Sequence, residues 1–167
     1  MIRSMFIRFN LCGVVLLLAP LVSAEPLQPT ASNCDSLNSV PLRQHFDYAT
    51  DIQPIFSARC ANCHVDANGN FEADLVLDPG ESWSNLVNHP SSQLGGENFL
   101  RVRPSQPWGS LLFWKLNCGT PGLGQRMPFA RPPIPIEDQA MIHDWILAGA
   151  PEFLDDTVFR SQFETRG

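Results

Sequence analysis

Five consecutive residues carry the clearest chemistry in this sequence, Cys60-Ala61-Asn62-Cys63-His64. Two thiols separated by two residues can reach the two vinyl groups of one porphyrin, and the adjacent histidine then lies over the iron. The C-x-x-C-H spacing is the attachment pattern for c-type haem. It predicts one covalent haem c per chain, with Cys60 and Cys63 as attachment residues and His64 as an iron ligand.

Three other kinds of site could use the same residues, and the surrounding sequence favours none of them. A thioredoxin-type redox pair needs a helix that begins at the first cysteine, whereas here a helix is expected before Cys60. A zinc site needs a second pair of ligands, and Cys118 stands alone. A disulfide between Cys60 and Cys63 would stabilise the protein little, because it closes a very short loop.

Haem iron in an electron carrier usually has a second protein ligand, and a methionine thioether is the ligand that raises the reduction potential. Met127 is the preferred candidate because it lies in a glycine-rich segment. Pro128 favours an extended backbone at Met127, which would direct the side chain into a pocket. The sequence therefore predicts His64 and Met127 as the two metal ligands.

Other side chains could also bind the iron, but each has a simpler expected role. Met141 lies on the core face of a predicted helix and is expected to pack there. His143 lies on the polar side of the same helix and is expected to be solvated. His45 and His89 are expected at the surface, with His89 the reserve ligand because imidazole suits iron.

Helices are expected to position these residues, since no strand signal is convincing. The first helix is predicted to begin at Thr50 or Asp51, with Pro54 tolerated in its first turn, and to lead into Cys60. Two short helices are predicted at about 81–88 and 110–116.

The last predicted helix, at 137–148, has the clearest signals. Acidic residues at its start complement the helix dipole, and Gly149 followed by Pro151 ends it. Glycine and proline dominate residues 119–135, and so long a loop in a small domain usually has a functional reason. The expected fold is a small all-α domain with long Gly/Pro-rich loops around one haem.

The chain opens like a secretory signal peptide. Arg3 and Arg8 precede the apolar run Leu11–Val22, and Ser23-Ala24 suits a signal peptidase. The run is shorter than the roughly 20 residues of a spanning helix, so cleavage after Ala24 is favoured over a retained anchor. We therefore expect a periplasmic or secreted protein without stable membrane insertion after cleavage.

The predicted organisation is a signal peptide at 1–24, an irregular arm at 25–47, a haem domain at 48–151 and a tail at 152–167. Cleavage removes two of the 11 basic residues and none of the 17 acidic ones, which moves the formal charge from −6 to −8. So acidic a chain is a poor candidate for binding nucleic acid. Its charge either favours a partner with a basic docking patch or only maintains solubility.

The sequence resembles the planctomycete-type cytochrome c domains of the class I cytochrome c superfamily. The resemblance covers roughly residues 48–151 and rests on several short pieces of sequence: Asp51-Ile52-Gln53-Pro54-Ile55-Phe56, Cys60 to His64, Leu75-Val76-Leu77-Asp78, Val102 through Pro104, Ser110-Leu111-Leu112, Met127-Pro128 and Trp145-Ile146-Leu147-Ala148-Gly149-Ala150.

The resemblance implies a helical shell around a single haem, in which the first and last helices cross and Met127 is the distal ligand. Many class I members also have a proline soon after the histidine, and its carbonyl holds the ring N–H of that histidine. This chain lacks such a proline, which leaves the hydrogen-bond partner of His64 open.

Several further residues have expected roles. Cys34 and Cys118 remain in the mature chain, and an oxidising compartment favours a disulfide between them. This bond would pin the arm to the segment before the methionine loop, the glycine-rich loop that contains Met127. Haem propionates would need hydrogen-bond donors, for which Arg126 is the first candidate in a group of six: Trp83, Trp108, Trp114, Arg101, Arg103 and Arg126. The apolar side of the tail, which includes Phe153 and Leu154, either docks on a partner or packs on its own domain.

These observations predict an electron-transfer protein rather than an enzyme. Its redox partner would be another protein, for example a membrane oxidoreductase. Two alternatives stay open: a haem enzyme or gas sensor in which the methionine is displaced, and a haem subunit of a larger oxidoreductase complex.

Overall fold

The computed structural model describes residues 33–65, 72–93, 95, 97–120 and 122–154, and in this part all the regular secondary structure is helical, joined by long loops. The predicted signal peptide, the first residues of the arm and the tail beyond 154 lie outside this part. Within it no strand forms, and the extended segments meet only in isolated bridges such as Val87–Val102 and Pro90–Leu100. The all-α expectation is therefore confirmed for the described residues.

The helix that leads into the cysteines begins earlier than predicted. A π-helical turn, η1 (Tyr48–Ile52), continues directly into α1 (Gln53–Arg59). The cap is Asp47, whose side chain accepts a hydrogen bond from the Thr50 backbone N–H, so neither Thr50 nor Asp51 has that role. Pro54 lies in the first turn of α1, where a missing N–H costs little.

The other three predicted helices are present with ends shifted by one or two residues. They are α2 (Ser82–Leu86), α3 (Leu111–Asn117) and α4 (Ile136–Leu147). Short 3₁₀ turns form at η3 (Glu72–Asp74) and η4 (Pro107–Gly109). Gly149 follows α4 with a φ of 101°, a conformation that favours glycine, and so ends the helix where the sequence predicts.

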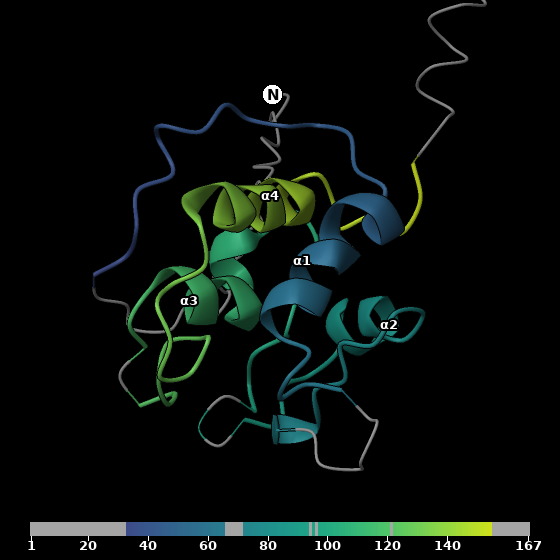
Figure 1. The fold of residues 1–167 in the computed structure, drawn as a ribbon. Coiled ribbons are helices and arrows are strands. Elements are labelled where there is room, and N and C mark those ends of the chain that lie inside the picture. Colours follow the sequence, from purple (N-terminus) through teal and green to yellow (C-terminus); the bar gives the residue numbers. More distant parts are fainter. Residues whose placement is uncertain (1–32, 66–71, 94, 96, 121, 155–167) are drawn as a thin grey trace, which may run out of the picture.

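The first and last helical segments pack against each other at both ends. The rings of Tyr48 in η1 and Trp145 in α4 lie 5.3 Å apart, and Arg59 at the end of α1 forms a 3.2 Å ion pair with Asp138 at the start of α4. Figure 1 shows α4 lying over α1 and α3, with α2 on the far side of α1. Their inward faces form one core that also includes loop residues: Phe46, Tyr48, Ile52, Phe56, Leu77, Leu86, Val102, Phe113, Leu116, Ile134, Ile142, Trp145, Ile146 and Ala150.

The arm is irregular, as predicted, over its described residues 33–47. It runs from α3 along α4 to η1 (Figure 1), and Arg43 in the arm donates its backbone N–H to Asp144 of α4. The structure joins Cys34 of the arm to Cys118 at the end of α3 in a disulfide, which bears out that prediction. The arm is thus fastened at one end covalently and along its length by contacts with α4.

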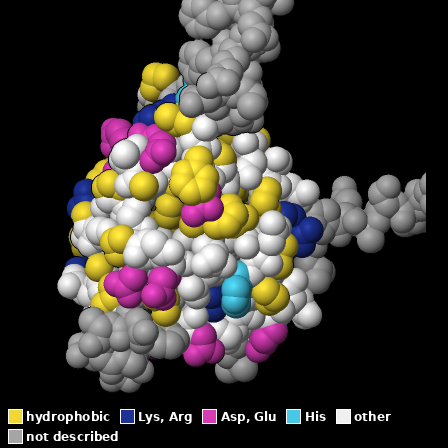
Figure 2. Space-filling model, turned by 90° about the vertical axis from the view of Figure 1, so that its right-hand side faces the viewer, with side chains coloured by type: hydrophobic (Ala, Val, Ile, Leu, Met, Phe, Trp, Pro, Cys, Tyr) yellow, Lys and Arg dark blue, Asp and Glu magenta, His cyan; other side chains and the backbone are white. Residues whose placement is uncertain are grey.

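The surface carries its acidic side chains in several separate groups. Figure 2 shows this for one face of the molecule, where acidic and apolar side chains alternate with neutral ones. Phe153 and Leu154 at the start of the tail are 71% and 48% exposed, so these two do not pack on their own domain. None of the helices in the described residues is long and apolar enough to cross a membrane.

Candidate haem site

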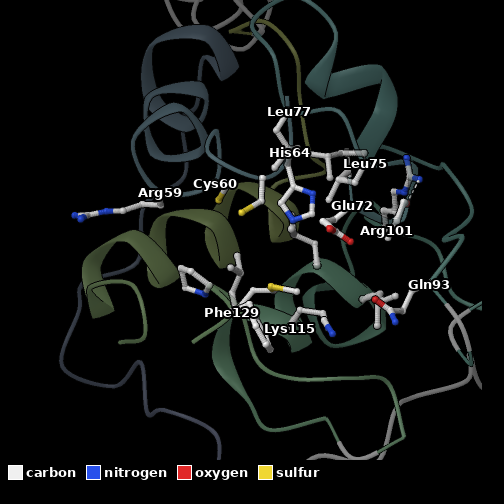
Figure 3. A pocket seen from close by; sticks show the side chains of 18 of the residues that line it. Arg59, Cys60, His64, Glu72, Leu75, Leu77, Gln93, Arg101, Lys115 and Phe129 are labelled. Carbon is white, nitrogen blue, oxygen red and sulfur yellow. Dashed lines mark hydrogen bonds between the residues drawn. The ribbon is translucent and has the colours of Figure 1, made fainter. Parts of the chain in front are cut away.

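The four residues singled out by the sequence line a single cavity of about 420 Å³. Cys60, Cys63 and His64 reach it from the turn after α1, and Met127 reaches it from the loop between α3 and α4. In Figure 3, Cys60 and His64 lie on one side of the cavity, and Lys115 and Phe129 lie on the other. Its volume is in the range of natural ligand sites.

The two cysteines are presented by a tight turn that ends α1. The backbone N–H groups of Cys63 and His64 both donate to the carbonyl oxygen of Cys60, each over 3.1 Å. Both thiols are free, with Cys63 exposed and Cys60 half-buried. Burial and the neighbouring Cys63 raise the pKa of the Cys60 thiol to about 11, so it is a neutral thiol at physiological pH.

His64 lines the cavity as a half-buried side chain. Burial lowers the pKa of its imidazole, which keeps a ring lone pair available, while the backbone at Leu75 and Glu72 acts in the opposite direction. Its Nδ1 atom is buried and receives no hydrogen bond. The backbone of the same segment holds the residue in place, because Leu77 donates its N–H to the His64 carbonyl over 2.7 Å.

Met127 is held on the opposite wall by the last turn of α3. Its backbone N–H donates to the Lys115 carbonyl over 2.7 Å, and its side chain packs partly buried against the core. The Met127–Pro128 peptide bond is cis. The loop that the sequence marked as unusually long for a small domain therefore delivers this side chain to the cavity.

The other ligand candidates do not line the cavity. Met141 packs against the core, as expected, and its sulfur accepts from Arg43 over 3.4 Å. His89 is exposed and its Nδ1 lies 2.9 Å from the Pro90 carbonyl oxygen, and His45 is exposed. The prediction for His143 is wrong: its side chain is only 18% exposed.

His143 is covered because the side of α4 on which it lies faces other rings rather than water. The ring of Phe113 lies 5.1 Å from its imidazole at 61°, and that of Trp108 lies 6.4 Å away. Its Nδ1 atom lies 2.8 Å from an Asp144 carboxylate oxygen. The residue is a packed part of the α3–α4 contact.

Two buried cations face the cavity, and the sequence analysis missed one of them. Arg101 is 5% exposed and Lys115, the only lysine of the chain, is 8% exposed. Burial lowers the pKa of both groups. Among the described lining residues the only acid is Glu72. A lone lysine inside the apolar helix Leu111–Asn117 was the signal that could have identified Lys115.

Neither buried cation has a carboxylate ion-pair partner in the described residues. The Lys115 ammonium donates to the Leu123 carbonyl over 2.6 Å. The Arg101 guanidinium donates to the carbonyls of Asn85 and Asp74 over 2.9 Å each. The Asp74 charge is near enough to raise the pKa of Arg101 against the larger effect of burial. Carbonyl dipoles thus offset part of the cost of burying the charges.

The first candidate for binding haem propionates is not at the cavity. The Arg126 guanidinium pairs with Asp35 of the arm, and its Nε donates to the Leu116 carbonyl over 2.8 Å. That prediction is wrong because the arm, whose path the sequence does not reveal, supplies a closer carboxylate. Of the six side chains considered for this role, only Arg101 lines the cavity.

The tryptophans considered for the same role are occupied elsewhere. The indole N–H of Trp83 donates to the Ala150 carbonyl over 3.0 Å, and that of Trp114 donates to the Trp108 carbonyl over 2.7 Å. Trp108 packs edge-on against Phe113. Arg103 does not line the cavity, and its buried Nε has no hydrogen-bond partner.

The residues of the cavity fit a covalently attached haem. They provide two free thiols three positions apart, a half-buried imidazole whose buried Nδ1 has no hydrogen-bond partner, the Met127 thioether and apolar sides, formed by Leu75, Leu77, Leu86, Leu111, Leu112, Leu116 and Phe129. No three His, Cys, Asp or Glu side chains gather around a bare metal ion in the described residues. A porphyrin supplies four nitrogen ligands itself, so the chain needs to add only the axial ones.

Comparison with known proteins gives no relative: no protein-family model, curated protein or solved structure matches this chain.

Proposed function

We propose that this chain is an exported mono-haem c-type cytochrome that carries electrons. Haem c would be attached through Cys60 and Cys63, with His64 and Met127 as axial ligands, in a class I cytochrome c-like domain at residues 48–151. The observation that carries the proposal is that Met127, more than 60 positions from His64, lines the same cavity as the attachment motif. Neither the spacing of these residues in the sequence nor the disulfide requires Met127 to lie beside the attachment motif.

The haem would supply one-electron chemistry, its iron cycling between ferric and ferrous states. The chain's own residues set the conditions for this cycle. With His64 and Met127 both bound to the iron, the haem would have no free position for a substrate, and the Met127 thioether would favour the reduced form. The leucines around the cavity exclude water, which keeps reorganisation small when the charge changes.

The buried cations gain a role under this proposal. A haem carries two propionates, and Arg101 and Lys115 both line the cavity. Figure 3 shows Lys115 with Gln93 on one part of its wall and Arg101 on another, near Glu72 and Leu75. Buried charges without a partner are costly, so a carboxylate placed beside them would be stabilised. Arg101 and Lys115 therefore replace Arg126 as the residues we assign to the propionates.

The first experiment tests covalent attachment. The full chain is expressed for export with a working haem-attachment system, and its intact mass and visible spectrum are measured. Each thiol adds across a vinyl group without loss of atoms, so the mass should exceed that of the mature polypeptide by one whole haem. The Cys60→Ala/Cys63→Ala variant is the control and should be colourless. A colourless wild-type protein with the mass of its bare polypeptide would refute the proposal.

The second experiment tests the distal ligand, and it also separates an electron carrier from a haem enzyme or sensor. Met127→Ala should abolish the weak near-infrared sulfur-to-iron band of the oxidised protein and allow rapid carbon monoxide binding when reduced. Met141→Ala is the matched control, because Met141 packs on the core away from the cavity, and it should keep the band. A wild-type protein that lacks the band and binds carbon monoxide rapidly would favour the enzyme or sensor.

A further inference from the structure

Asp35 connects the arm to three other segments of the chain. Its carboxylate pairs with Arg126 through two guanidinium nitrogens and accepts a 2.9 Å hydrogen bond from Gln139 of α4. Its backbone N–H donates to the Asn117 carbonyl over 3.1 Å, and its own carbonyl accepts from the Asn117 side chain over 3.0 Å. Through Asp35 the arm holds the ends of α3 and the methionine loop against α4.

Two of the side chains that bond to Asp35, Asn117 and Gln139, are buried and also form hydrogen bonds to other groups. Asn117 and Gln139 are 0% and 1% exposed. The Asn117 amide also donates to the Gln139 side-chain oxygen over 2.9 Å, and the Gln139 amide also donates to the Ile134 carbonyl over 2.9 Å. Loss of the Asp35 charge would weaken the pairing of Arg126 and the hydrogen bond from Gln139, and buried donors left unpaired are costly.

Arg126 is the link from Asp35 to the cavity. It directly precedes Met127, and the two residues run beside the last turn of α3, where Arg126 Nε bonds the Leu116 carbonyl and Met127 N–H bonds the Lys115 carbonyl. The rest of the Arg126 guanidinium is held by Asp35, and the Cys34–Cys118 disulfide fixes the residue before Asp35 to the end of α3.

We propose that Asp35 is a positioning residue for Met127: by holding Arg126, it keeps the Met127 thioether in the cavity. The inference rests on the proposed haem function, since it names a residue that positions the distal ligand of that site. Asp35 does not line the cavity. By holding Arg126 it would lower the fraction of molecules in which Met127 has left the iron. A smaller open fraction slows every ligand that competes with Met127.

The test uses the haem-loaded full chain with Asp35→Asn. The near-infrared band of the oxidised form and the rate of carbon monoxide binding to the ferrous form both report on the Met127–iron bond. Arg126 and Asp35 are 21% and 36% exposed, so solvent screens part of their attraction, and we expect carbon monoxide binding to accelerate roughly threefold to tenfold. Asp35→Glu, which keeps the charge, should restore most of the wild-type rate.

Asp51→Asn is the matched control. Asp51 also pairs with an arginine of the arm, Arg43, over 2.7 Å, but this pair is not connected to Met127. The control should keep the wild-type rate. Equal rates in wild type and Asp35→Asn, or equal acceleration in Asp35→Asn and Asp51→Asn, would overturn the inference.

Failure of the inference can be told apart from failure of the haem proposal. A wild-type chain without haem refutes the haem proposal, whereas a haem-loaded wild type with the band and an unchanged Asp35→Asn refutes only the role of Asp35. If Asp35→Asn does not fold, the rate is measured on Arg126→Lys, which loses the two-nitrogen pairing with Asp35. Faster binding in Arg126→Lys supports the inference, and an unchanged rate overturns it.

Discussion

Removing the disulfide should be the largest single loss of stability available outside the core. Cys34 and Cys118 are 84 positions apart in the sequence, so their bond constrains most of the unfolded mature chain. The chain-entropy relation for a loop of that length gives about 4.6 kcal/mol at 25 °C. We therefore expect the Cys34→Ser/Cys118→Ser variant to lose between about 2 and 5 kcal/mol of unfolding free energy.

The loss should act through the unfolded state, because the arm has other anchors in the folded protein. Asp35 keeps its pairing with Arg126, and Phe46 of the arm is 2% exposed in the core. In guanidinium chloride, a slope of about 4 kcal/mol per molar predicts that the unfolding midpoint falls by about 1 M with no change of slope. A lower slope in the variant would mean that the arm has already detached in the native state.

The assay is guanidinium unfolding at pH 7, followed by far-ultraviolet circular dichroism on wild type and variant. Wild type measured in reductant is the control. Its unfolding midpoint should equal that of the variant, because both proteins then lack the disulfide. A single Cys34→Ser variant should behave in the same way, with the Cys118 thiol left free. Midpoints of the variant and the oxidised wild type that agree within about 0.2 M would refute the loop-closure reasoning.

Three further predictions concern the core, the arm and the methionine loop. Phe56→Ala empties a fully buried site in α1 and should cost about 3–5 kcal/mol in the same unfolding assay. The hydrogen bond from Arg126 holds the pKa of Asp35 below the usual value of 3.8. The stability that the Asp35–Arg126 pair contributes is therefore complete above that value and is lost as the pH falls through the pKa of the folded state. Unfolding measured from pH 6 to pH 2 should show this fall, and Asp35→Asn should flatten it. Gly124→Ala should destabilise by about 1 kcal/mol in thermal unfolding, because φ is +77° and the new Cβ would lie 3.3 Å from Lys115 Nζ.

Local features of this protein were readable from its sequence because each depends on neighbouring residues. The attachment motif is contiguous, so the close approach of Cys60, Cys63 and His64 follows from a single turn of backbone. The helix at 137–148 carries its own start and stop signals, and α4 begins and ends within a residue of that prediction. The cap at Asp47 was missed because Thr50 and Asp51 offer equally good capping side chains and only the backbone path selects among them.

Tertiary structure decided which distant side chains share an environment. Sequence separation gives no distance, so nothing in the chain alone could show that Arg126 turns to Asp35 or that His143 is covered by Phe113. Each of these outcomes depends on the route of a loop or the arm across the helices. The sequence by itself predicted haem attachment at residues 60–64 and determined the helical class of the fold. The packing of α3, α4 and the arm determined which methionine reaches that chemistry and what holds it there, because burial and ion pairing depend on contacts between segments that are far apart in the chain.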